Sequence, residues 1–175
     1  MNKKHTQLIG IIEGFFGRSW SWEDRKNYAQ FLAQNAYDFY IYAPKSDKNL
    51  RTLWQQDWPS ETKDQLSDLR ETYRSANVQF GIGLSPHEIY LDNSRDQRDQ
   101  LNKRIQQINQ LEPDTLCILF DDMRGDIPDL AQIQIDIAHQ AATTSNAKKI
   151  IFCPTYYSFD PVLERVFGNM PENYW

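Results

Sequence analysis

The segment TLCILFDDM, Thr115–Met123, decides the fold class and marks the place where chemistry is expected. Five apolar residues, 116–120, lead directly into the adjacent carboxylates of Asp121 and Asp122. A continuous apolar run of this kind is typical of a parallel strand that is buried on both faces. Two neighbouring carboxylates repel each other, and the repulsion grows as water is excluded. A fold tolerates such a pair where it is solvated, binds a cation or performs acid–base catalysis.

Four further segments share the features of this strand, because they are short, apolar and rich in β-branched and aromatic residues. They are QLIGIIEG (7–14), DFYIYAP (38–44), VQFGIGLS (78–85) and KKIIFCPTYY (148–157). Longer amphipathic segments separate them. The order of elements is therefore βαβαβαβαβ, which predicts an α/β protein with a parallel sheet and right-handed crossovers.

The amphipathic segments predict four helices. One is expected to start at Ser21, whose hydroxyl can cap it with Asp24 at the third position, and another starts at Ser60. The segment 127–142 supplies a further helix. In the segment 98–111 the apolar residues recur at the spacings of one helix face: Leu101, Ile105, Ile108 and Leu111.

Two architectures fit this order of elements, an open doubly wound sheet and a (β/α)8 barrel. An open nucleotide-binding sheet usually has a glycine-rich turn after its first strand. Here that turn is EGFFGRSW (13–20), in which two phenylalanines separate the glycines, so it is a poor phosphate cradle. The TIM barrel is therefore favoured, with a functional site at the carboxyl ends of the strands.

The length of the chain bounds how much of a barrel it holds. A complete barrel is typically ~250 residues, whereas this chain has 175, with NYW (173–175) as the opening of a sixth strand. We expect residues 1–175 to form one partial catalytic domain, the first five to six βα units of a longer barrel. Either the chain is a fragment of a longer enzyme, the favoured interpretation, or it is a truncated product. By itself it is expected to be poorly stable and weakly active or inactive.

Composition and charge exclude some classes of function. The net charge is −5 and the pI about 5.2, with no basic block, which argues against a nucleic-acid partner. No segment is long and apolar enough to span a bilayer, so no membrane partner is expected. Lys3 and Lys4 precede an apolar stretch, but Glu13 interrupts it and no cleavage site follows, which predicts a cytoplasmic protein. Cys117 and Cys153 lie in apolar runs, which favours two buried reduced thiols.

Polar residues gather where the predicted strands end. In chain order these ends are Glu13-Gly14, Pro44-Lys45, Ser85 to His87, Asp121-Asp122 and Pro154 to Tyr157. Because the carboxyl ends of parallel strands meet at one edge of the sheet, we expect these side chains to converge on one mouth.

Each of these residues also has a structural explanation. Lys45 can be a solvated loop lysine, His87 a solvated residue beside a proline, and Tyr157 a hydroxyl that closes the barrel end. Glu13 is interpreted as structural, paired with an arginine such as Arg18. The aspartate pair can cap a helix or bind a cation, but a cation needs further acidic or histidine ligands at nearby strand ends. Only Glu13 and His87 are available, so a metal site is disfavoured.

Four motifs together resemble the family 84 glycoside hydrolases, the β-N-acetylglucosaminidases that include O-GlcNAcases and hyaluronidase-type enzymes. The motifs are EGFFGRSWSWEDR (13–25), YIYAPKSD (40–47), ILFDDM (118–123) and FCPTYYS (152–158). They occur in the family's order with similar spacing and cover essentially the whole chain. Four positions depart from the family pattern, which usually has Tyr, Pro, an acidic residue and Glu there: Phe16, Ser19, Ser46 and Tyr156.

The resemblance implies a retaining, substrate-assisted hydrolysis of β-linked N-acetylglucosamine, an exception to the two-carboxylate scheme. Asp121 would accept the acetamide N–H, and Asp122 would be the general acid and then the general base. Both can serve one site only if the chain turns just after the apolar run. No cofactor or metal is expected, and the resemblance implies that the partner is an N-acetylglucosamine-containing glycan or glycoprotein. The sugar-binding residues carried over are Gly14, Lys45, Tyr157 and Trp175.

Two rival functions stay open. A non-catalytic glycan-binding protein would keep part of the pocket, although binding alone needs no proton donor at Asp122. An unrelated acid–base barrel enzyme would not require a 2-acetamido substrate. The sequence predicts neither the oligomeric state nor the physiological glycan.

Overall fold

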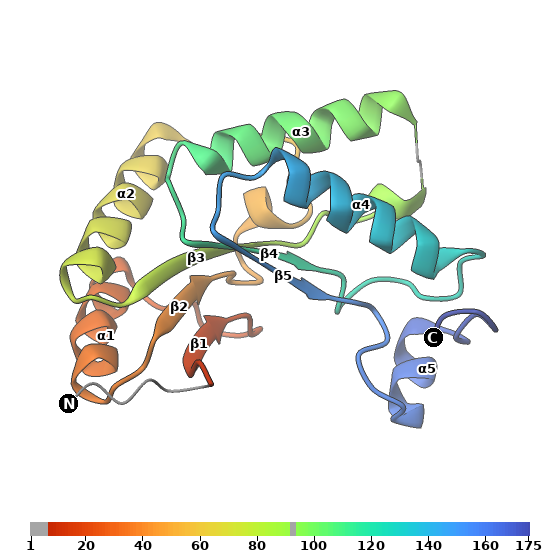
Figure 1. The fold of residues 1–175 in the computed structure, drawn as a ribbon, viewed down its shortest axis with the longest axis horizontal. Helices are drawn as coiled ribbons and strands as arrows, with labels where there is room; N and C mark the ends of the chain where they lie inside the picture. Colours follow the sequence, from red (N-terminus) through yellow and green to blue (C-terminus); the bar gives the residue numbers. More distant parts are fainter. Residues whose placement is uncertain (1–6, 92–93) are drawn as a thin grey trace.

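A computed structural model describes residues 7–91 and 94–175 (Figure 1). The expectations for Lys3 and Lys4 lie outside the described residues. The five predicted strands are confirmed as one parallel sheet in the sequential order β1-β2-β3-β4-β5. Their bounds are β1 Gly10–Glu13, β2 Phe39–Tyr42, β3 Gln79–Leu84, β4 Thr115–Leu119 and β5 Lys149–Cys153.

The four predicted helices are confirmed as well. They are α1 Trp22–Gln34, α2 Ser60–Ser75, α3 Arg95–Asn109 and α4 Leu130–Thr144. At the start of α1, Ser21 and Asp24 form a reciprocal capping box, since each side chain accepts a hydrogen bond from the other's backbone N–H. Three short elements were not predicted from the sequence: η1 Lys48–Leu50, η2 Ile89–Leu91 and α5 Pro161–Phe167.

The two faces of the sheet are covered differently. Because the strands follow in sequential order, right-handed crossovers put successive helices on the same face, and α1 to α4 form one arc outside the sheet (Figure 1). The main core lies between these helices and the sheet, and it includes fully buried apolar residues of α3 such as Leu101 and Ile105. A doubly wound sheet would have helices on both faces. The arrangement is therefore that of a partial TIM barrel, as predicted.

The opposite face carries a small second cluster of apolar side chains. It consists of Ile41 of β2, Ala43 just after β2, and Cys117 and Leu119 of β4. Gly83 of β3 lies beside this cluster, and a Cβ there would come within 2.6 Å of the Ala43 Cβ. Small residues thus let the neighbouring strands pack closely on the face that corresponds to the inside of a barrel.

The parallel arrangement also fixes where a site can lie. All five strands point the same way, so the residues that follow them gather along one edge of the sheet. The sheet order leaves β1 and β5 at its two edges, and α5 lies beyond the end of β5, away from the arc of α1 to α4 (Figure 1). Among the helices of the described ranges, none combines the length and apolar character that a bilayer span requires.

Candidate active site

The two aspartates that follow β4 share one lysine. Lys45, which follows β2, places Nζ 3.0 Å from Asp121 Oδ2 and 2.5 Å from Asp122 Oδ2. The lysine side chain is 3% exposed, whereas those of the aspartates are 28% and 29% exposed. One buried cation therefore offsets the repulsion between two adjacent anions at a position still open to solvent. The expected convergence of these strand ends is confirmed for the three residues.

The end of β4 allows both carboxylates to reach the lysine. The strand ends at Leu119, and a turn begins at Asp121. In a continuing strand the two aspartates would point to opposite faces, so the turn after Phe120, as expected, is what brings them together. Asp121 also keeps one oxygen, Oδ1, buried without a hydrogen-bond partner among the described residues. That oxygen can accept a hydrogen bond from a bound ligand.

The loop that carries Lys45 is held by the residue two positions further on. Asp47 Oδ2 accepts hydrogen bonds from the Tyr42 hydroxyl (3.0 Å) and from Trp58 Nε1 (2.9 Å), and its Oδ1 accepts one from the Asn49 backbone N–H (2.9 Å). Carboxylate acceptors make strong hydrogen bonds when partly shielded from water. The lysine is thus presented from a loop with fixed geometry.

Glu13 is structural, as predicted, but its partner is Arg25 rather than Arg18. Glu13 is completely buried, and the Arg25 guanidinium donates to both of its oxygens from Nε and Nη2, with the shortest contact at 2.7 Å. The Tyr40 hydroxyl donates to Glu13 Oε2 as well. Arg18 is closer to Glu13 in the sequence, whereas Arg25 lies 12 residues away, but Arg25 is a buried residue of α1 and its guanidinium reaches the end of β1.

Gly14 and Tyr157 lie at strand ends, but the described contacts do not join them to the aspartates. Gly14 is half-buried, and a Cβ on it would meet only Ile12 Cγ2, at 3.5 Å. The space beside its backbone is therefore open to a ligand. Tyr157 is 53% exposed.

Trp175 packs near the end of the described chain. Its Nε1 donates to Met170 Sδ at 3.0 Å, and its ring centroid lies 4.8 Å from that of Phe159. The indole is 63% exposed. These contacts place Trp175 with the segment around α5 rather than with Lys45.

The positions that depart from the family pattern have distinct environments. Phe16 is exposed, with its ring centroid 6.0 Å from Lys45 Nζ. Ser19 and Ser46 are hydrogen bonded to each other, Oγ to Oγ, at 2.6 Å, so two of the departures join the loops after β1 and β2. Tyr156 is buried, and its hydroxyl donates to a backbone carbonyl 2.6 Å away. This tyrosine therefore packs in the core.

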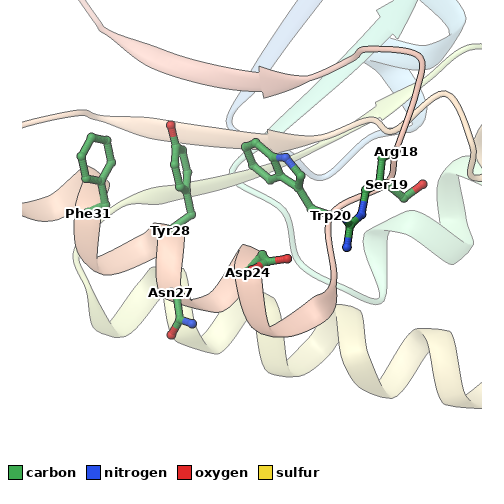
Figure 2. A pocket seen from close by; sticks show the side chains of 7 residues that line it. All are labelled: Arg18, Ser19, Trp20, Asp24, Asn27, Tyr28 and Phe31. Carbon is green, nitrogen blue, oxygen red and sulfur yellow. The ribbon is translucent and has the colours of Figure 1, made fainter.

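A surface hollow beside α1 is separate from the aspartate cluster. Figure 2 shows Trp20, Tyr28 and Phe31 in a row, with successive ring centroids 4.9 and 5.2 Å apart. None of the predicted catalytic or sugar-binding residues lines this hollow. Its lining residues are Arg18, Ser19, Trp20, Asp24, Asn27, Tyr28 and Phe31.

Other reactive groups near the strand ends are poorly suited to nucleophilic or metal chemistry. Cys117 and Cys153 are both free thiols. Burial, reinforced by the Asp121 carboxylate, raises the pKa of Cys153 to about 11, so this thiol stays protonated at neutral pH. His87 Nδ1 lies 3.9 Å from Glu88. Within 7–91 and 94–175 no three Asp, Glu, His or Cys side chains are grouped to hold a metal ion.

Two buried polar residues near the aspartates, Thr155 and Gln134, had no role predicted from the sequence. Thr155, just after β5, donates its hydroxyl to the Phe120 carbonyl at 2.8 Å and accepts a hydrogen bond from Gln134 Nε2 at 2.7 Å. Gln134 occupies a buried position of α4 between Leu130 and Ile137. A polar residue within the apolar stripe of a helix is a signal that could have identified it.

Comparisons with known proteins find similarity along nearly the whole chain. A sequence model of the family described as beta-N-acetylglucosaminidase matches residues 9–169. Protein O-GlcNAcase from Rattus norvegicus and that from Mus musculus are each 28% identical over 160 residues, covering 86% of this chain and 17% of the relative. The solved structure of a mutant O-GlcNAc hydrolase of Thermobaculum terrenum superposes with a TM-score of 0.79 at 29% identity, covering 95% of this chain and 40% of that chain.

The matches cover this chain almost completely but cover only a part of each relative. They cover nearly all of this chain, which spans about a sixth of the length of the curated relatives and two fifths of the solved one. The family match includes both the β2 end with Lys45 and the β4 end with Asp121 and Asp122. This chain belongs to the β-N-acetylglucosaminidase family.

Proposed function

We propose that the protein hydrolyses β-linked N-acetylglucosamine in glycans or glycoproteins, and that residues 1–175 are part of its catalytic barrel. The observation that carries the proposal is the position of one buried ammonium between two adjacent, half-buried carboxylates. A structural ion pair needs one carboxylate, whereas acid–base chemistry on a sugar needs an anion and a proton donor side by side. Family membership supports the same reaction class.

The proposed reaction uses the substrate's own acetamido group as nucleophile. Its carbonyl oxygen bonds to the anomeric carbon while the glycosidic C–O bond breaks, and Asp122 gives its proton to the departing oxygen. Asp121 accepts a hydrogen bond from the acetamide N–H, a role for which its unpartnered Oδ1 is suited. Water then attacks the anomeric carbon, Asp122 takes its proton, and the acetamide is restored. One water is consumed and the anomeric configuration is retained.

Lys45 has two parts in this proposal. Its ammonium lowers the repulsion between the aspartates, and it can donate a further hydrogen bond to a sugar hydroxyl because a lysine has three N–H donors. Gly14, Tyr157 and Trp175 are proposed to contact the sugar. The open space beside Gly14 supports its part, since a backbone without a side chain can be approached closely.

The test is the hydrolysis of an aryl 2-acetamido-2-deoxy-β-glucoside beside the matching plain glucoside. Both substrates are offered to the 175-residue chain and to a version extended through the remaining strands of the barrel. We expect turnover of the acetamido sugar alone. Equal hydrolysis of both sugars would contradict the substrate-assisted mechanism, and binding without turnover in either form would favour a glycan-binding protein.

A further inference from the structure

We infer that Thr155 and Gln134 are positioning residues that hold the end of β4 in the geometry that brings Asp121 and Asp122 to one site. The inference deepens the proposed function and rests on it for its kinetic test. It starts from a change in the hydrogen bonding between β4 and β5, one residue before the aspartates.

The regular β4–β5 ladder stops at Phe120. The Phe120 N–H donates to the Cys153 carbonyl at 2.9 Å, as in a parallel ladder. The next bond of such a ladder would run from the Thr155 N–H to the Phe120 carbonyl. Instead the Thr155 hydroxyl donates to that carbonyl at 2.8 Å, and the Thr155 N–H points to Gln134 Oε1 at 3.4 Å. A side chain thus replaces a backbone group, so the two strands separate where the aspartates begin.

The replacement is stable because every group in it has a partner. Gln134 Nε2 donates to Thr155 Oγ1 at 2.7 Å, and Gln134 Oε1 also accepts from the Tyr174 hydroxyl at 2.7 Å. That hydroxyl in turn accepts from the Tyr156 N–H at 3.3 Å. Thr155 and Gln134 are 0% and 1% exposed, so water cannot substitute for a lost partner. A fully satisfied buried network of this kind fixes one geometry.

The Phe120 carbonyl, which the Thr155 hydroxyl holds, directly precedes the turn that begins at Asp121. Without the Thr155 hydroxyl, that carbonyl would either accept a hydrogen bond from the Thr155 N–H, as in a regular parallel ladder, or stay unpaired. We expect either outcome to move Asp121 and Asp122 relative to Lys45. The contacts that would change are those of Lys45 Nζ with Asp121 Oδ2, at 3.0 Å, and with Asp122 Oδ2, at 2.5 Å. Neither Thr155 nor Gln134 is proposed to touch the substrate.

The experiment compares Thr155→Val, which keeps the shape and removes the donor, with Thr155→Ser, which keeps the donor. Thr115→Val is the matched control, because Thr115 is a buried threonine at the other end of β4. In the form of the protein that hydrolyses the aryl N-acetylglucosaminide, we expect Thr155→Val to lower kcat roughly 10- to 100-fold, the loss that a misplacement of about 1 Å can cause. KM should change little, Thr155→Ser should restore most of kcat, and Thr115→Val should match the unmodified protein.

A second readout does not depend on activity. In the 175-residue chain, the backbone amide NMR signals of Asp121 and Asp122 should shift in Thr155→Val and keep their positions in Thr155→Ser. If these signals do not move, the positioning role is wrong whether or not the protein is an enzyme. If Thr155→Val and Thr115→Val have the same kcat, it is wrong as well. If the signals move but no form hydrolyses the sugar, the positioning role stands and the proposed function fails.

Discussion

Two charge clusters lie at the carboxyl ends of strands of this sheet, one after β1 and one after β4, and they differ in burial, in the number of carboxylates and in hydrogen bonding. At the end of β1, the Glu13 carboxylate is completely buried and receives hydrogen bonds from Arg25 and Tyr40 on both oxygens. At the end of β4, two carboxylates share one ammonium and stay partly exposed, and Asp121 Oδ1 has no hydrogen-bond partner among residues 7–91 and 94–175.

The two clusters differ in whether they can still bind a ligand. A planar guanidinium matches a single carboxylate and leaves no capacity for a ligand, so the Glu13 pair can only hold α1 to the sheet. A lysine is a point charge with spare donors, and it leaves the aspartates free to bind and exchange protons. Acidic residues at strand ends are therefore informative about function only when their hydrogen-bonding capacity is unfilled.

The largest expected effect is the loss of catalysis when the proposed proton donor is changed. Asp122→Asn should lower kcat by roughly 10²- to 10⁴-fold, the contribution of general acid–base catalysis, because an amide cannot deliver or accept the proton. The measurement is hydrolysis of the aryl N-acetylglucosaminide. Asp126→Asn, in the same loop but paired with Arg124, is the control and should retain activity. An active Asp122→Asn variant would exclude Asp122 as the acid. If the protein only binds glycans, the Asp122→Asn variant should bind the sugar with unchanged affinity.

The next largest effect concerns stability. Glu13→Gln should lower the free energy of unfolding by about 3–5 kcal/mol, because it leaves a buried guanidinium without its counter-charge. Urea unfolding monitored by circular dichroism measures this difference. The control is Asp68→Asn, which breaks the exposed Lys26–Asp68 pair and should change stability by less than about 1 kcal/mol. Equal effects for the two substitutions would show that burial does not distinguish these pairs.

The coupling between Lys45 and Asp121 should be smaller but measurable. In a double-mutant cycle of Lys45→Met and Asp121→Asn, we expect an interaction energy of about 0.5–3 kcal/mol in unfolding, typical of residues in one charge network. The same cycle on the exposed Arg95–Asp99 pair should give only about 0.2–0.5 kcal/mol. A coupling near zero at Lys45 would mean that the lysine does not stabilise the aspartate pair.

The smallest effect on stability is expected at Gly14. Gly14→Ala should change the free energy of unfolding by less than about 0.5 kcal/mol, as a substitution away from packed groups does, because its Cβ would meet only one atom at 3.5 Å. The apparent affinity for the sugar should nevertheless fall. Gly83→Ala is the contrasting variant, since its Cβ would lie 2.6 Å from Ala43 Cβ, and overpacking typically costs about 1–3 kcal/mol. Unchanged KM for Gly14→Ala would remove Gly14 from the proposed pocket.

Much of the fold could be predicted from local patterns. Uninterrupted apolar runs identified the five strands, and the spacing of Leu101, Ile105 and Ile108 identified the buried face of α3. The capping box at Ser21 fixed the start of α1 to the residue. These features depend on neighbours in the sequence, so the sequence contains them directly.

The details of the site depend on residues far apart in the chain. The sequence predicted a general convergence of the strand ends, but not the contacts of Lys45 with both aspartates. The predicted partner of Glu13, Arg18, was wrong, because charge and proximity in the sequence do not distinguish Arg18 from Arg25. Thr155 was noted only as part of the polar segment 154–157 after the fifth strand, and nothing in the sequence singled it out, since a threonine after a strand has many uses. Its role follows from the position of Gln134 on another element.

The sequential order of the strands also bears on how the molecule assembles. Each strand pairs with the one that precedes it in the chain, so βα units can be added one after another as they leave the ribosome. Glu13 and Arg25 are 12 residues apart and can pair early, whereas Lys45 and Asp121 are 76 residues apart. We therefore expect the scaffold to form before the charge cluster, and pulse-labelled hydrogen exchange would show β1 and β2 protected before β4. Assembly in this order would keep the aspartate pair apart from its lysine until the surrounding sheet is in place.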